Sequence, residues 1–473
     1  MEKKNIKLFS SLKFPKGKLL FLWLYTIVLI IISMLLFNQL FDMSLTTWHT
    51  HDFLDCLFSG KISQFYSITA EKAANNQYFS NGINMDAASY SPFTYAVLSV
   101  VIFPIYIIIK ILGITQIYSA YAEAIRLFMV GFSIWASMLL KKICDEANIG
   151  KAISTSTYYY FSSPIFIVCT LICNQYDVIA IIICLYAILA FMKGRHNLFS
   201  LLMGISACFK PFAIVAFFPI ILFKEKNLFG LLKKSLLALC PLLITNFLPL
   251  LIDSGYRNIV GVREENFSFF SSLTDATIKG GLSDISLFFL AYVILCGISY
   301  CMNNKVDDSF YKAMLLGLAS YMVFFTFVKF NIHWMIYIFP FLSIVVLFSK
   351  NYERMLVMES GFSWFYVISA FMSAPITNQV YYSPFFTTHP EIPLELTDDL
   401  YFYEHYLPSK IVPFTLMVGF GVALLLSAYK ATQEDCSQEL KSKNTEFVLL
   451  LIRASSILLY IVPALISIFM VCL

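Results

Sequence analysis

The sequence predicts an all-α, polytopic membrane protein with about 11–13 helical membrane segments, some of them short or re-entrant. Of its 473 residues, 59% are hydrophobic and 13% charged, and its mean hydropathy is +0.76. Soluble domains carry roughly 25% charged residues, so this chain has about half their charge. Apolar runs of roughly 18–22 residues recur, and each can cross about 30 Å of hydrocarbon as a helix. The runs do not alternate apolar and polar residues, which excludes an outer-membrane barrel.

The N-terminal tail, residues 1–18, precedes a first predicted span over about 19–40. The tail is rich in lysine, and the positive-inside rule therefore predicts a cytoplasmic N-terminus. The apolar run is longer than the core of a typical signal peptide, and no small-residue cleavage site follows it. We therefore expect an uncleaved anchor helix in a multi-pass protein of the cell membrane.

Two regions follow the tail, a membrane core over 19–350 and C-terminal membrane helices over 351–473. The core contains a polar first outer loop, 41–92, and the C-terminal region contains an acidic outer loop, 375–410. Further apolar segments are expected at about 93–112, 121–140, 159–173, 178–192, 198–223, 235–252, 285–301, 313–328, 333–348, 362–374, 411–428 and 447–473. Basic or mixed loops are expected on the cytoplasmic side at 193–197, 224–234, 303–312, 350–354 and 430–443.

One region does not fit simple alternation across the membrane. Lys141, Lys142 and Lys151 are typical of the cytoplasmic side, but counting spans from the first helix puts them outside. Either a segment between residues 93 and 140 does not cross, or 159–173 is a re-entrant pair broken at Pro164. The segment 198–223 is a second candidate for two half-helices, since Lys210 and Pro211 interrupt it.

The net charge of +4 is modest and lies mainly in short loops, which favours an orientation signal over a nucleic-acid surface. We therefore expect membrane lipids as partners and no nucleic acid. The eleven cysteines are scattered, mostly within apolar runs, and are interpreted as small buried residues rather than disulfides or metal ligands.

Ionisable residues at the edge of the first span form the first candidate site. His51, Asp52 and Asp55 follow one another closely, and carboxylates three residues apart share one face of a helix. One carboxylate could act as a general base at the membrane surface. The three side chains could also bind a divalent ion, or belong to an ordinary hydrated loop.

Two further candidates lie inside apolar surroundings. Gln175 and Asp177, in the element Asn174-Gln175-Tyr176-Asp177, can bind polar groups or simply cap a helix. Lys210 precedes a proline in the middle of an apolar run, where an unpaired ammonium is costly. Such a lysine suits a lipid-borne phosphate, unless it extends to the interface.

Two weaker candidates complete the set. Lys329 and His333 are four residues apart at a predicted helix start, where they could bind a phosphate or a sugar hydroxyl or belong to an aromatic belt. Glu123 and Arg126 lie three residues apart in an apolar run and are expected to pair, in a structural or a substrate-binding role.

Taken in order, these elements resemble the GT-C superfamily of integral-membrane glycosyltransferases. The likeness is to bacterial polyprenyl-phosphate-mannose-dependent mannosyltransferases and to the catalytic subunit of GPI mannosyltransferase I. An acidic residue in the first outer loop corresponds to Asp52, and a tyrosine-proline element corresponds to Tyr90-Ser91-Pro92. The spacer from Gly60 to Tyr66 is also similar. A Gly-Gln-x-Asp element is represented by residues 174–177, with asparagine replacing glycine.

The resemblance continues through the basic turn at 193–195 and the glycine-led helix from Gly204 to Lys210-Pro211, and ends with the basic-aromatic element at 329–340. It covers about residues 46–347. The first outer loop departs from the double-aspartate form of some members, because a single aspartate, Asp52, lies between His51 and Phe53.

The resemblance implies transfer of a hexose, often mannose, from a polyprenyl-phosphate sugar to an acceptor on the outer face. Asp52 would be the catalytic general base, acting with inversion. Lys210, with His333 or Lys329, would hold the phosphate, while Tyr90, Gln175 and Asp177 would line the site. The acceptor could be a glycolipid, a wall polymer or a protein, and a partner subunit is not specified. No organic cofactor is expected, and metal dependence stays open.

Two other classes stay open. A flippase for lipid-linked glycans or a polysaccharide polymerase would also be large, aromatic and basic, and the outer loop 375–410 suits a polymerase. A secondary transporter is disfavoured because the chain has no recognisable internal repeat.

Overall fold

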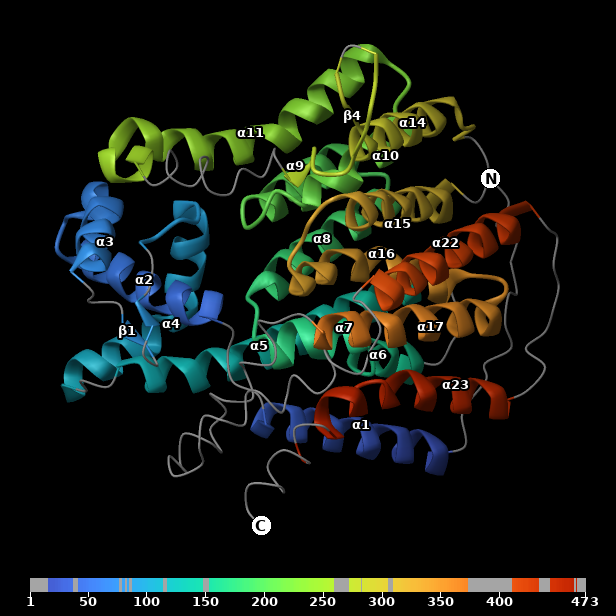
Figure 1. Cartoon of the computed structure of the whole chain (residues 1–473), viewed down its shortest axis with the longest axis horizontal. Helices are drawn as coiled ribbons and strands as arrows, with labels where there is room; N and C mark the ends of the chain where they lie inside the picture. The colour runs from blue at the N-terminus through green and yellow to red at the C-terminus, as the bar shows by residue number, and fades with distance from the viewer. Residues whose placement is uncertain are drawn as a thin grey trace.

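The protein is an all-helical membrane protein, as a computed structural model shows (Figure 1). The structure describes residues 16–36, 41–75, 79–80, 83–84, 87–113, 117–147, 153–258, 272–281, 283–304, 309–372, 411–433, 443–462 and 465. The predicted outer loop 375–410, Lys151 and most of the N-terminal tail lie outside these ranges. Within them, seven helices are long and apolar enough to cross a membrane, and four apolar helices are shorter. The predicted fold class is thus confirmed.

The predicted first outer loop, 41–92, is largely helical. Helix α1 (Lys16–Leu36) precedes this stretch. The stretch itself contains α2 (Phe41–Phe58), the short η1 (Ile62–Gln64) and α3 (Phe65–Ala74). Gly60 ends α2 in the left-handed conformation at φ 71°. The amide of Gly60 donates to the carbonyl of Leu57 and that of Lys61 to Cys56, a pattern in which glycine avoids a steric penalty. Two antiparallel strands of two residues each, β1 (Phe79–Ser80) and β2 (Ile83–Asn84), come next.

Helices α4 (Pro92–Leu112) and α5 (Ile117–Glu146) each contain an apolar stretch long enough to cross a membrane. Helix α5 has 30 residues and is therefore about 45 Å long. It extends beyond the predicted 121–140 and includes Lys141 and Lys142. At its end, Glu146 pairs with Lys193, whereas near its start Tyr121 contacts the ring of His51 on α2. Since Lys110 at the end of α4 also pairs with α2, both ends of the α4–α5 connection lie beside α2.

The segment predicted at 159–173 is interrupted, as one of the two alternatives required. Helix α6 (Ile153–Phe161) ends before Pro164, and α7 (Pro164–Phe166) continues into a π-helix, η2 (Ile167–Ile172). Proline at the first position of α7 has no amide hydrogen to lose, and Ser163 caps that turn. The predicted break at Pro164 is therefore confirmed, whereas the re-entrant course of this segment stays a prediction.

The segment predicted at 198–223 consists of two half-helices, as expected. Helix α8 (Asp177–Met192) turns through Gly194, at φ 74°, into α9 (His196–Ala207), and α10 (Ala213–Lys224) begins after Pro211. Helix α11 (Leu228–Ile252) then packs along α9. A second hairpin, β3 (Thr277–Ile278) and β4 (Ile285–Ser286), leads to α14 (Leu287–Cys301).

In Figure 1, the long helices of the C-terminal half run in roughly the same direction. This half contains α15 (Ser309–Phe327), the 3₁₀ helix η3 (Ile332–Ile338), α16 (Phe339–Phe348), α17 (Tyr352–Phe371), α22 (Ile411–Gln433) and α23 (Lys443–Ser455). Helix α17 packs on α22 and α23. Because α17 begins at Tyr352, Arg354 is helical and the expected loop at 350–354 is shorter than predicted. The expected segment at 362–374 likewise starts ten residues too late.

Candidate functional site

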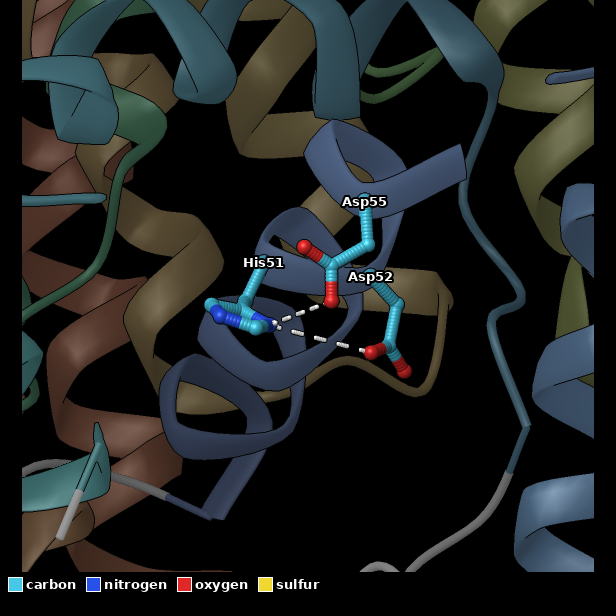
Figure 2. Close-up of side chains that lie close together, drawn as sticks. All are labelled: His51, Asp52 and Asp55. Atoms are coloured by element: carbon cyan, nitrogen blue, oxygen red, sulfur yellow. Dashed lines mark ion pairs between the residues drawn. The ribbon is translucent and has the colours of Figure 1, made fainter. Parts of the chain in front are cut away.

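The first polar cluster lies on α2, where His51, Asp52 and Asp55 lie on one face (Figure 2). The Nδ1 atom of His51 lies 3.8 Å from an oxygen of Asp52 and 3.7 Å from one of Asp55. Asp52 is 3% exposed, and His51 is 4% exposed. The prediction that the two carboxylates share one face of a helix is confirmed, and the alternative of an ordinary hydrated loop is wrong for these residues.

Two lysines compensate the carboxylates of this cluster. Lys72 on α3 binds the Oδ1 atom of Asp52 at 2.6 Å, and Lys110 on α4 binds the Oδ1 atom of Asp55 at 2.9 Å. The Tyr106 hydroxyl also donates to Asp55 at 2.6 Å. Lys72 was missed from the sequence, because a lysine on a polar helix gives no sign of which carboxylate it will meet.

The same three side chains place ligand atoms within 4.8 Å of one another, close enough to hold a metal ion together. However, two ammonium groups already balance the two carboxylates. A divalent ion would therefore compete with both lysines, so the donor set does not by itself favour a metal.

Cys56 lies next to this cluster and is not a candidate nucleophile. Burial raises the pKa of the Cys56 thiol to about 11, and the negative charge of Asp52 adds to the effect. Since the thiolate is the nucleophilic form, the thiol is inert near neutral pH.

The second polar cluster lies at the start of α8 and is enclosed by protein. Lys210, 5% exposed, binds the Oδ2 atom of Asp177 at 3.0 Å. The Tyr337 hydroxyl of η3 donates to the other oxygen of Asp177 at 3.1 Å. The Lys210 ammonium also lies 5.2 Å from the ring centre of Tyr176 and 5.8 Å from that of Tyr90. The sequence thus correctly selected Lys210, Asp177 and Tyr90 as neighbours, but missed Tyr337.

Asn174 and Gln175 precede this cluster in unusual backbone. Asn174 has φ 49°, and the structure has no other non-glycine residue with positive φ among those it describes. Asparagine tolerates this left-handed conformation better than most residues, which explains physically why it can replace a glycine here. The backbone amide of Gln175 donates to the carbonyl of Cys169, within the π-helix η2, at 3.2 Å.

Each of the two clusters has an ion pair of its own, since Asp52 pairs with Lys72 and Lys210 pairs with Asp177. Aromatic residues lie between the clusters. Tyr95 lies 6.0 Å from His49 and 6.4 Å from Tyr90, measured between ring centres.

Hydrogen bonds connect the segment Tyr90-Ser91 both to α3 and to the break after α9. Burial raises the pKa of the Tyr66 hydroxyl well above its usual value, so this group stays protonated and donates to the carbonyl of Tyr90 at 2.7 Å. The Ser91 hydroxyl donates to the carbonyl of Cys208 at 2.9 Å, beside the break before Lys210. The tyrosine-proline element therefore joins the outer stretch to the broken helix.

Asp253 fixes the outer stretch from another direction and was not predicted. Its carboxylate accepts hydrogen bonds from the amide of Tyr66, the hydroxyl of Ser67 and the amide of Gly255, at 2.7–2.8 Å. These bonds tie the end of α11 to the first turn of α3, where a negative charge also suits the helix dipole.

The two weaker candidate pairs, Lys329 with His333 and Glu123 with Arg126, lie outside the helices α2 and α8. His333 on η3 is buried, whereas Lys329, before η3, is exposed. Arg126 donates to the carbonyl of Met34 at 2.7 Å, tying α5 to α1. The expected pair of Arg126 with Glu123 falls on a side chain outside the described part of the structure.

No family model matches the sequence, and no curated protein matches it. The class defined by the fold is therefore a polytopic helical membrane protein with two buried polar clusters.

Proposed function

We propose that the protein transfers a hexose, with mannose the first candidate, from a polyprenyl-phosphate sugar to an acceptor hydroxyl at the outer face of the membrane. The observation that carries the proposal is a nearly buried carboxylate, Asp52, in an ion pair with a partly exposed lysine, Lys72. The resemblance of the chain to GT-C glycosyltransferases supports the same class. The acceptor would be a glycolipid, a wall polymer or a protein.

In the proposed reaction, Asp52 removes the proton of the acceptor hydroxyl as that oxygen attacks the anomeric carbon. The bond between the anomeric carbon and the phosphate oxygen breaks at the same time, with inversion. The polyprenyl phosphate leaves as a monoester and carries the electron pair of the broken bond. Cations stabilise the charge that develops on it.

Lys72 is the cation best placed to meet the leaving phosphate, because it is the one bound to Asp52. Its side chain is 33% exposed, in contrast to 6% for Lys210. A phosphate that binds Lys72 would draw it from Asp52 and leave the carboxylate a stronger base. Lys210, already balanced by Asp177, would instead organise the deeper part of the site.

Replacement of the proposed base is the central test. We expect Asp52→Asn to lower kcat by about 10²–10⁴-fold, the usual contribution of a general base. The assay measures formation of glycosylated acceptor from a radiolabelled polyprenyl-phosphate sugar by the purified protein. Asp145→Asn, an exposed carboxamide substitution at the end of α5, is the matched control and should keep full activity. Near-normal turnover by Asp52→Asn would remove Asp52 from its role.

The role of Lys72 predicts a different kinetic pattern. Lys72→Met should lower kcat/KM for the donor by roughly tenfold or more, because it removes a charge that stabilises the leaving phosphate. Lys142→Met, an exposed substitution on α5, should leave the donor kinetics unchanged. Equal kinetics for both variants would contradict the assignment. Movement of lipid or solute without a new glycosidic bond would instead support a flippase or a transporter.

A further inference from the structure

Two adjacent carboxamides shortly before Asp177 in the chain have no hydrogen-bond partner among the residues that the structure describes. Both polar atoms of the Asn174 side chain and both of the Gln175 side chain are buried and unpaired in the part of the chain that the structure describes. Both residues are 0% exposed. Buried polar groups in proteins are nearly always paired, so two complete carboxamides without partners are exceptional.

The surrounding backbone is also unusual. A π-helix, η2, precedes the two residues, Asn174 adopts the left-handed conformation, and the 3₁₀ helix η3 packs against η2. π-Helical turns within helices occur frequently at functional sites. Irregular backbone among membrane segments is tolerated where protein or a polar cavity surrounds it. The unpaired carboxamides therefore lie where the backbone departs from regular helix on both sides.

Charge determines what such a site can recognise. Lys210 and Asp177 neutralise each other, and the Tyr337 hydroxyl occupies the second oxygen of Asp177. The site therefore offers donors and acceptors without net charge. A phosphate has no matching donor for the carboxamide oxygens and would meet the carboxylate of Asp177. A hydroxyl group both donates and accepts, and so fits a carboxamide.

His333, on the 3₁₀ helix η3 that packs against η2, adds a further unpaired polar atom. Its Nε2 atom is buried and unpaired within the described residues, and it lies on η3, the element that also supplies Tyr337. The rings of Tyr90 and Tyr176 lie 5.9 Å apart over Lys210 and provide apolar surface. Of these aromatic residues, Tyr90 is only partly buried, so access is expected from its side.

We infer that Asn174 and Gln175 form the subsite that recognises the hydroxyl groups of the hexose, separately from the cation that meets the phosphate. The inference rests on the proposed function, since the hexose would enter as part of the lipid-linked donor. It assigns sugar specificity to the two carboxamides and phosphate binding to lysine.

The test compares binding of two lipids to the purified full-length protein in detergent, polyprenyl phosphate and polyprenyl-phosphate mannose. Gln175→Met keeps the side-chain volume, and Asn174→Gly keeps the left-handed backbone available. The matched control is Gln64→Met, which removes an exposed carboxamide on η1. Dissociation constants and melting temperatures are measured for each variant.

We expect the wild type to bind the mannosyl lipid more tightly than the bare lipid. Each site variant should lose about tenfold of that preference, as for a lost hydrogen bond near the upper end of the usual range, with little change for the bare lipid. The melting temperatures of the variants should be equal to or above that of the wild type, because a buried unpaired group is removed. Gln64→Met should match the wild type in both measurements.

Three results would overturn the inference. An unchanged preference in both variants would mean that the carboxamides bind only water, and a clear fall in melting temperature would mean that they are structural. Equal binding of the two lipids by the wild type would also refute a sugar subsite, while leaving lipid-phosphate binding intact. Failure of the wild type to bind either lipid would overturn the proposed function itself, and with it this inference.

Discussion

Glu359 and Arg453 form an ion pair that is completely buried, with both side chains 0% exposed. The Nε atom of Arg453 donates to Glu359 at 2.6 Å, and its Nη1 atom donates to the carbonyl of Tyr159 and the hydroxyl of Ser162. Ser363 donates to the other carboxylate oxygen. The pair thus joins α23, α17 and the end of α6, beside the break at Pro164.

Removing one partner of this pair leaves the other charge buried alone. We expect Arg453→Met to lower the free energy of unfolding by about 3–5 kcal/mol, and the double variant Glu359→Met with Arg453→Met to recover most of it. Thermal unfolding in detergent checks both values. Lys142→Met, on the exposed side of α5, serves as the control with no expected change. Equal stability of Arg453→Met and the wild type would show that the pair does not hold α23.

At the scale of elements, close helix packing depends on Gly204. A β-carbon on Gly204 would collide with the backbone carbonyl of Ala238, so α9 and α11 approach each other backbone to backbone. The same pair of helices positions the break at Lys210 and, through Asp253 at the end of α11, the first turn of α3. The glycine therefore matters for both polar clusters, although it touches neither.

The substitution Gly204→Ala should force the two helices apart. We expect a loss of about 1–3 kcal/mol in the free energy of unfolding, as for overpacking elsewhere. Gly131→Ala on α5 is a matched control, because a β-carbon there meets nothing within 4 Å and alanine favours helix. Thermal unfolding of both variants checks the difference. If Gly204→Ala were as stable as Gly131→Ala, the backbone contact would not constrain α9.

At the scale of the whole molecule, contacts between helix ends show which parts of the chain lie near each end of α5. Lys193 pairs with Glu146, Asn304 binds the carbonyl of Lys224, and Phe447 packs against Phe21 at the start of α1. The α2 cluster lies at the opposite end of the 45 Å helix α5 from Lys193. The basic turn at Lys193 and the candidate base on α2 therefore lie at opposite ends of α5.

This arrangement predicts the orientation in the membrane. A biotin-acceptor peptide inserted after Gly194 should be labelled by a biotin ligase expressed in the cytoplasm, because basic turns stay inside. The same peptide inserted after Gly60 should not be labelled in intact cells, but should be labelled after lysis. A peptide placed before Lys16 provides the cytoplasmic reference. Labelling at Gly60 without lysis would reverse the proposed side of the site.

Apolar run length and the position of prolines were sufficient to predict the helical class, the half-helices meeting at Lys210-Pro211 and the break at Pro164. The reason is that a bilayer requires every backbone group to be paired within its own segment, which makes helices the default and prolines their interruptions. Motif order also selected Asp52, Asp177, Lys210 and Tyr90, because ionisable and aromatic residues are conspicuous in apolar surroundings.

Only the tertiary structure decided the partners of those residues. Lys72 and Lys110 reach the α2 cluster from other helices, and Tyr337 and Asp177 meet 160 residues apart in the chain. Such pairings depend on how helices pack, and side-chain chemistry along the chain does not encode which distant group lies within 3 Å. By itself, the sequence determined a helical membrane protein with a carboxylate and a lysine at chemically unusual positions. The tertiary structure placed each in its own ion pair, because helix packing brings Lys72 to the carboxylate of Asp52 and Asp177 to the ammonium of Lys210.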